Sequence, residues 1–261
     1  MTAAAAILDP RTTLARPDLA EQALEGVVRA SAFRAVRPMH CAVALADIHA
    51  AAVPGEYPID QLIFGEAFDV LDARGDRLWG RARRDGVVGW IDAASLAEGA
   101  PRPTHRVAGL DAALPLNALV VDPADDAGMT PVGEFASSPV EVAARLVGVP
   151  YRLGGRSSLG TDCCGLVQQA LYACGLPGPR YADLLAELGQ PVAAGEARRG
   201  DLVIWLDPAE GPWNGHAGFM LDDGRVLHAV GRLGGVVIEP FADADARHRV
   251  TGSSGPVFRR L

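Results

Sequence analysis

The pattern of hydrophobic and polar positions changes along the chain. Residues 17–31 carry apolar side chains at the spacing of one helical face, which predicts a helical segment within residues 1–36. Residues 37–99 instead hold short apolar runs separated by turns such as Asp85-Gly86, and strands this short and close predict a small all-β barrel. Residues 100–137 are rich in Pro, Gly, Ala and Asp, and we expect a linker or a reduced second module there.

The pattern in residues 138–261 predicts helices first and an antiparallel set of strands afterwards. Ser138, Pro139 and Glu141 have the spacing of a helix start, with serine at the N-cap. A second helix is expected after Thr161, because one apolar stripe runs from residue 163 to residue 174 before a glycine. The strand candidates are residues 201–206, 216–221, 226–230 and 235–239. These elements predict an α+β fold for the second half of the chain.

His216 and His228 flank a predicted hairpin, and the length of its turn decides whether they can act together. A two-residue loop would put the two imidazoles on opposite faces of the sheet. A three-residue loop, Asp222-Asp223-Gly224, would pair Gly218 with His228 and place both imidazoles on one face. Spacing alone leaves both registers open. In the first register, one histidine is buried and hydrogen-bonded and the other is exposed.

Composition and charge exclude several classes of function. The chain has 261 residues and a net charge of −8, and all 24 basic residues are arginines. Without lysine there is no Schiff-base mechanism, no phosphate-loop lysine and no Ser–Lys dyad. An acidic chain repels phosphate backbones, so we expect no nucleic-acid partner.

The apolar runs and the cysteines bear on location and on metal binding. No run of about 18 apolar residues occurs, and the amino terminus lacks the basic stretch of a signal peptide, so we expect no membrane span and a cytoplasmic protein. The four cysteines, at positions 41, 163, 164 and 174, fit reduced thiols and show no CxxC pairing. We therefore expect no disulfide framework and no zinc site, and hydrolysis by a cysteine thiolate would need no metal and no cofactor.

Cys163 has the position of an activated nucleophile. It follows Asp162 at the predicted helix start, where unpaired backbone N–H groups and the helix dipole favour a thiolate. Cys164 is rotated by about 100° from it, so a base on the sheet reaches Cys163 more easily. If both imidazoles share a face, His216 can take the thiol proton and His228 can orient the His216 imidazole. A cysteine on a helical stripe is otherwise an ordinary core residue, and we expect this of Cys174.

Five blocks of the second half, in order, resemble the NlpC/P60 cysteine peptidases. The blocks are Tyr151-Arg-Leu-Gly-Gly-Arg, Thr161-Asp-Cys-Cys-Gly-Leu-Val-Gln, Gly200-Asp-Leu-Val, His216-Ala-Gly-Phe-Met-Leu and Leu227-His-Ala. The resemblance covers residues 138–261 and implies a papain-like catalytic domain. Such proteins hydrolyse bacterial cell-wall peptides, commonly between D-glutamate and a diamino acid. The resemblance implies Cys163 as nucleophile, His216 as general base, His228 as third polar residue and Tyr151 as a hydroxyl for the oxyanion.

The first half resembles the bacterial SH3-like modules that precede such domains. The likeness is carried by Gln61-Leu-Ile-Phe-Gly-Glu66 and Asp85-Gly-Val-Val-Gly-Trp-Ile. In relatives this module restricts one end of the active-site groove, which implies short murein peptides with a free amino terminus as the substrate. Glu66 is our candidate partner for that amine; the alternative is an ordinary residue of a surface turn.

Three further residues are expected near the substrate. Trp213, just before His216, is placed to line the groove, and Asp162 adjoins the nucleophile. Cys164 stands where the family usually has a serine that helps to hold substrate. Two other functions stay open from sequence: a non-catalytic module that binds cell-wall peptides, and a papain-like amidase or acyltransferase acting on another substrate.

Overall fold

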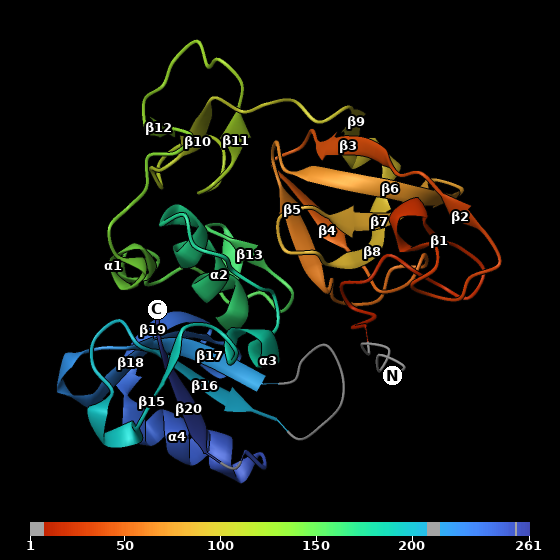
Figure 1. Ribbon diagram of the computed structural model, residues 1–261. Coiled ribbons are helices and arrows are strands. Elements are labelled where there is room, and N and C mark those ends of the chain that lie inside the picture. Colours follow the sequence, from red (N-terminus) through yellow and green to blue (C-terminus); the bar gives the residue numbers. More distant parts are fainter. Residues whose placement is uncertain (1–7, 208–214, 254) are drawn as a thin grey trace.

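The computed structural model describes residues 8–207, 215–253 and 255–261 (Figure 1). A β-barrel occupies the first part, a small sheet follows, and a mixed α+β unit forms the second half. The predicted fold class, an SH3-like β region followed by a papain-like α+β domain, is confirmed. Within the described residues, no helix combines the length and apolar character needed to cross a membrane.

The barrel consists of a five-stranded sheet and a two-stranded ribbon. The sheet has the order β8-β7-β6-β3-β9, and β4 pairs with β5. The bounds are β3 (Arg37–Cys41), β4 (Leu45–Ile48), β5 (Asp60–Ile63), β6 (Ala67–Arg74), β7 (Arg77–Ala82), β8 (Val88–Asp92) and β9 (Leu96–Glu98). Alternating side chains such as Ile48, Leu62 and Phe68 are fully buried and form one core. Trp79 and Trp90 are also buried, in a second cluster on the barrel.

The predicted helical segment within residues 1–36 is wrong for the residues that the structure describes. Residues 8–36 contain two short strands, β1 (Ala20–Glu21) and β2 (Phe33–Arg34), and one 3-10 turn, Gln22–Leu24. Leu19, which belongs to the predicted apolar face, instead packs with Leu14 and the two tryptophans of the barrel. Contacts with the barrel therefore override the local periodicity.

Residues 100–137 contain a three-stranded antiparallel sheet with the order β11-β10-β12. Its strands are β10 (His105–Val107), β11 (Leu119–Val120) and β12 (Met129–Pro131). Val107 and Ala118 pack against Ile63, so this small sheet extends the core of the barrel.

The second half is built on a six-stranded sheet with the order β15-β20-β16-β17-β18-β19. The strands are β15 (Gln190–Val192), β16 (Leu202–Leu206), β17 (Gly215–Met220), β18 (Arg225–Val230), β19 (Gly235–Pro240) and β20 (Pro256–Arg260), and β13 (Arg156–Ser157) pairs with β14 (Gly160–Thr161) nearby. The helices are α1 (Pro139–Ala144), α2 (Cys163–Ala173), α3 (Ala182–Leu185) and α4 (Phe241–Val250). The four strands predicted from the pattern lie within one residue of β16 to β19.

The two faces of this sheet have separate cores. On one face, Leu166 and Ala170 of α2 pack with Ile204, Phe219 and Leu227. On the other face, α4 places Ala244 in a cluster with Trp205 and Phe258. Alternate residues of β17 thus contact α2 and α4, which matters for the histidines below.

One detail of the predicted helix start differs. Ser138 has the extended backbone of an N-cap, but its side chain makes no capping hydrogen bond. Glu141 accepts hydrogen bonds from Arg199 instead of the helix start. The motif therefore predicts the position of the helix start correctly, but the hydrogen bonds between its side chains and the backbone are absent.

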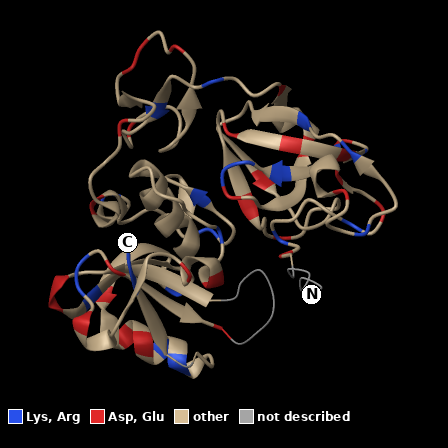
Figure 2. Ribbon diagram, in the orientation of Figure 1, with Lys and Arg blue, Asp and Glu red and all other residues tan. Residues whose placement is uncertain are grey.

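Buried ion pairs join the barrel to the second half. Arg156 of β13 is fully buried and contacts Asp60 at 3.0 Å and Glu66 at 2.5 Å, both from the barrel. Arg180 contacts Asp60 at 3.0 Å and Asp162 at 2.5 Å. Figure 2 shows acidic and basic segments on the two sides of this junction, between β5 and β13. We call the set Glu66, Arg156, Asp60, Arg180 and Asp162 the junction network.

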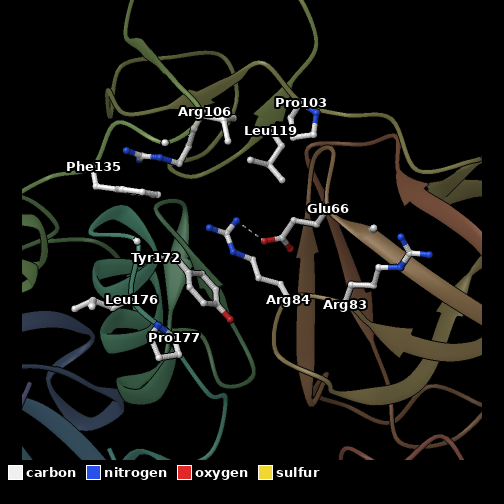
Figure 3. Close-up of a pocket in the computed structure, with 14 residues that line it drawn as sticks. Glu66, Arg83, Arg84, Pro103, Arg106, Leu119, Phe135, Tyr172, Leu176 and Pro177 are labelled. Carbon is white, nitrogen blue, oxygen red and sulfur yellow. Dashed lines mark hydrogen bonds and ion pairs between the residues drawn. The ribbon is translucent and has the colours of Figure 1, made fainter. Parts of the chain in front are cut away.

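A glycine permits the close approach at this junction. Gly154 has φ +77°, and a Cβ there would lie 2.0 Å from the carbonyl oxygen of Pro58 in the barrel. A cavity of about 490 Å³ lies at another part of the junction, where the barrel, the small sheet and the end of α2 meet. In Figure 3, Arg84 extends between Glu66 and Tyr172 at this cavity, with 3.1 Å to the carboxylate and 4.0 Å to the ring centroid.

Candidate active site

Cys163 is the first residue of α2, and its neighbours fix the helix start. The Asp162 side chain accepts a hydrogen bond from the amide of Gly165 at 2.8 Å, which caps the helix, and another from Gly154 at 3.0 Å. Arg180 pairs with both oxygens of the same carboxylate. The charge of Asp162 is therefore neutralised next to the sulfur, and a thiolate there meets no unpaired anion.

The surroundings of Cys163 favour the thiolate. The adjacent Cys164 thiol, with 3.9 Å between the two sulfurs, is the largest cause that lowers the pKa of Cys163, and the His216 imidazole lowers it further by charge and by a hydrogen bond. The amide of Ala217 also donates to the sulfur. These contacts outweigh burial, which alone would raise the pKa.

The other three cysteines have the opposite shift. Burial raises the pKa of Cys41 to about 12 and also raises that of Cys174. The pKa of Cys164 lies well above its usual range, first because its proton is shared with Cys163 and then because it is buried. Cys163 is thus the one cysteine of the four whose surroundings activate it.

The hairpin adopts the three-residue loop. Phe219 pairs with Leu227, and Leu221 donates its amide to the carbonyl of Arg225 across the turn. Gly224 has φ +67°, as this loop requires. Both imidazoles therefore lie on one face, and His216 Nε2 is 2.8 Å from His228 Nδ1.

The two histidine rings lie on the α4 side of the sheet. Trp205 packs against both rings, at 5.8 Å from His216 and 6.5 Å from His228 between centroids. Cys163 still reaches His216, because the start of α2 meets the start of β17. Since Nε2 of His216 bonds to His228, Nδ1 is the nitrogen left for the sulfur.

His228 is fully buried and has a further partner. Its Nε2 lies 2.7 Å from Oε1 of Glu239 on β19, and Arg247 of α4 donates to Oε2 of the same carboxylate at 2.9 Å. Burial and the neighbouring His216 lower the pKa of His228 to about 3, so its imidazole is neutral near pH 7. The sequence pattern did not indicate Glu239 or Arg247.

A cavity of about 430 Å³ opens beside His216. Tyr151 lines it, and burial together with the charge of Cys163 raises the pKa of the phenol, which therefore keeps its proton. His248 of α4 lines the same cavity, and its ring lies against that of His216, with 4.4 Å between the centroids and 30° between the planes. Burial and His216 lower the pKa of His248 to about 4. Sequence reasoning missed His248 because α4 lacks a clear apolar periodicity.

The predicted substrate-binding residues have other surroundings. Glu66 is 1% exposed and holds Arg156, Arg84 and the amide of Ile63, so it is neither a free carboxylate in a groove nor a surface turn residue. Its proposed pairing with a substrate amine is wrong, because both oxygens are already engaged.

Asp162 and Cys164 are also buried. The Asp162 carboxylate accepts hydrogen bonds from Gly154, Gly165 and Arg180, which fix the helix start, and its contact with substrate stays a prediction. Cys164 is 6% exposed and lies in the core beside Cys163. Trp213 lies outside the described residues. Among those that are described, no group of three or more His, Cys, Asp or Glu side chains has the arrangement of a metal site.

Known proteins match both halves of the chain. The NlpC/P60 family model matches residues 148–254, and the bacterial dipeptidyl-peptidase SH3 domain model matches residues 54–96. A crystal structure of an NlpC/P60 family protein from Bacillus cereus superposes with a TM-score of 0.70 over 85% of this chain and 99% of that one. At 15% identity this shows a shared fold.

Curated relatives match the second half. The peptidoglycan endopeptidase RipB of Mycobacterium tuberculosis is 33% identical over 123 residues, 42% of this chain and 49% of that protein. A probable endopeptidase of the same species is 35% identical over 97 residues, which span 37% of this chain and only 24% of that protein. A probable endopeptidase of Haemophilus influenzae is 35% identical over 121 residues, 43% of this chain and 73% of that protein. With a matching family model and a relative covered over most of its length, the chain belongs to the NlpC/P60 family.

Proposed function

We propose that this protein is a cysteine endopeptidase that hydrolyses murein peptides at the bond between D-glutamate and a diamino acid. The observation that carries the proposal is the environment of Cys163: the one cysteine with a lowered pKa contacts one member of a hydrogen-bonded histidine pair. The endopeptidases among its relatives support the choice of substrate class.

The proposed reaction proceeds through a thioester. The Cys163 thiolate attacks the amide carbonyl, and the oxyanion forms beside the first amides of α2 and the protonated hydroxyl of Tyr151. The His216 imidazolium gives its proton to the leaving amine, and the C–N bond breaks. His216 then removes a proton from water, which attacks the thioester and restores the thiolate and the imidazolium.

Defined peptides test the substrate. We expect the wild-type protein to cleave L-Ala-γ-D-Glu-diamino acid peptides between D-glutamate and the diamino acid, with products identified by mass spectrometry. Peptides with an acetylated amino terminus should be cleaved more slowly if short peptides with a free amine are the substrate. Equal cleavage of both forms contradicts the free-amine part, and no cleavage of any peptide by fully reduced protein contradicts the endopeptidase.

Alkylation tests the thiolate without a substrate. Because its pKa is lowered, we expect Cys163 to react with iodoacetamide well below about pH 8, while the three cysteines with raised pKa values react slowly at that pH. Removing the stabilising imidazole in His216→Ala should move the reaction to higher pH. Peptide mapping identifies the modified cysteine, and preferential modification of Cys174, which is more exposed, would contradict the assignment.

A further inference from the structure

The hydrogen-bond chain that starts at Cys163 does not end at the second histidine. It continues through Glu239 to Arg247, which come from β19 and α4. The Glu239 side chain is 12% exposed, and that of His228 is fully buried. A carboxylate therefore lies at the end of the two-imidazole relay that is away from Cys163.

The protons of this relay can be placed by counting donors and acceptors. An imidazolium at His216 carries protons on both nitrogens, so its Nε2 must donate to Nδ1 of His228. His228 is neutral and must then hold its single proton on Nε2. That proton needs an acceptor, and an ionised carboxylate can only accept. Glu239 at 2.7 Å is that acceptor.

Arg247 keeps this carboxylate ionised. Burial raises the pKa of Glu239, but the hydrogen bonds from Arg247 and His228 lower it by more. Arg247 contacts both carboxylate oxygens, which also fixes the direction of Oε1 toward His228. The groups that face the histidine pair are thus Cys163 from α2, Glu239 from β19, and Arg247 and His248 from α4.

We propose that Glu239 is a positioning residue, which holds the proton of His228 on Nε2 and thereby stabilises the imidazolium–thiolate pair of His216 and Cys163. The inference rests on the proposed peptidase function for its kinetic consequence, but its effect on the thiolate does not require a substrate. The competing role is mechanical: the Glu239–Arg247 ion pair would then simply fasten α4 to the sheet.

Two substitutions of the same residue separate these roles. Glu239→Gln keeps an oxygen that can accept from His228 but removes the charge that pairs with Arg247, whereas Glu239→Leu removes both. If proton placement matters, Gln retains more activity and a lower thiolate pKa than Leu does. If only the ion pair matters, both variants behave alike. Arg249→Met is the matched control, because it removes the Asp245 ion pair of the same helix outside the relay.

The readouts are the pH profile of Cys163 alkylation and the kinetics of peptide cleavage. We expect Glu239→Leu to shift the alkylation profile to higher pH and to reduce kcat by about 10- to 100-fold, with KM within about twofold, as for other carboxylates that orient a functional histidine. The alkylation profile and the kcat of Glu239→Gln should lie between those of Glu239→Leu and the wild type. Arg249→Met should match the wild type in both measurements. An unshifted alkylation profile in Glu239→Leu, or equal losses in Leu and Gln, would overturn the proposal. If the wild type cleaves no peptide and the profile still shifts, the proposed function fails and this inference stands.

Discussion

Cys163→Ala is expected to reduce peptide hydrolysis by roughly 10⁵- to 10⁶-fold, the loss typical of removing a catalytic nucleophile. Alanine has no group that can form the thioester, and the histidine pair has no other activated thiol within reach. The substitution removes only one sulfur atom at the start of α2, so the fold should be retained. Single-turnover and steady-state cleavage of the defined peptide measure the loss.

Cys164→Ser is the matched control for this variant. Serine restores the residue type that the family usually has here, and its hydroxyl can donate to a Cys163 thiolate from the place of the Cys164 thiol, whose hydrogen bond lowers the pKa of Cys163. We therefore expect kcat/KM within about tenfold of the wild type. Cleavage by Cys163→Ala together with its loss in Cys164→Ser would show that the nucleophile is the second cysteine.

Arg156→Met is expected to lower the stability of the protein by about 3–5 kcal/mol. Arg156 is fully buried against Asp60 and Glu66, with Asp85 at 3.6 Å, and its loss leaves carboxylates in the interior without their main counter-charge. For a chain of this size the midpoint of thermal unfolding should fall by roughly 10 °C. Calorimetry measures the shift.

Arg152→Met is the corresponding control at the same junction. Arg152 also reaches across to the barrel, at 2.7 Å from Asp47, but its side chain is 46% exposed. Exposed pairs contribute about 0–1 kcal/mol, so the midpoint should change by no more than about 4 °C. If both variants unfold at the same temperature, the buried network does not provide the stability we assign to it.

Local signals in the sequence are sufficient to predict that Cys163 lies at the start of a helix. The helix start at Asp162-Cys163 depends on neighbouring residues, and the apolar stripe that follows has one helical period, so α2 could be predicted. The pairing of His216 with His228 could not be predicted, because a change of one residue in the length of the loop moves a side chain to the other face of the sheet. Only the structure shows that the longer loop is the one formed.

The features that the sequence did not predict depend on contacts between segments that are distant in the chain. Glu66 and Arg156 are 90 positions apart, and no periodicity relates them, so the sequence alone predicts Glu66 on the surface or in the groove. His248 and Arg247 lie on a helix whose only fully buried residue is Ala244, and such a helix gives no hydrophobic signal. The prediction of a helix around Leu19 is wrong for the opposite reason. The helical pattern is present in the sequence, but packing against the barrel tryptophans determines the structure.

The carboxylate of Asp162 serves two parts of the molecule. It ends the junction network through Arg180, and it caps the helix that carries Cys163. Excising residues 138–261 as a separate unit would take away Asp60, Glu66 and Asp85 while leaving both arginines behind. Engineering that exchanges the barrel for another module must therefore transplant these three acids at the same positions, or Arg156 and Arg180 lose their barrel counter-charges beside the helix that carries Cys163.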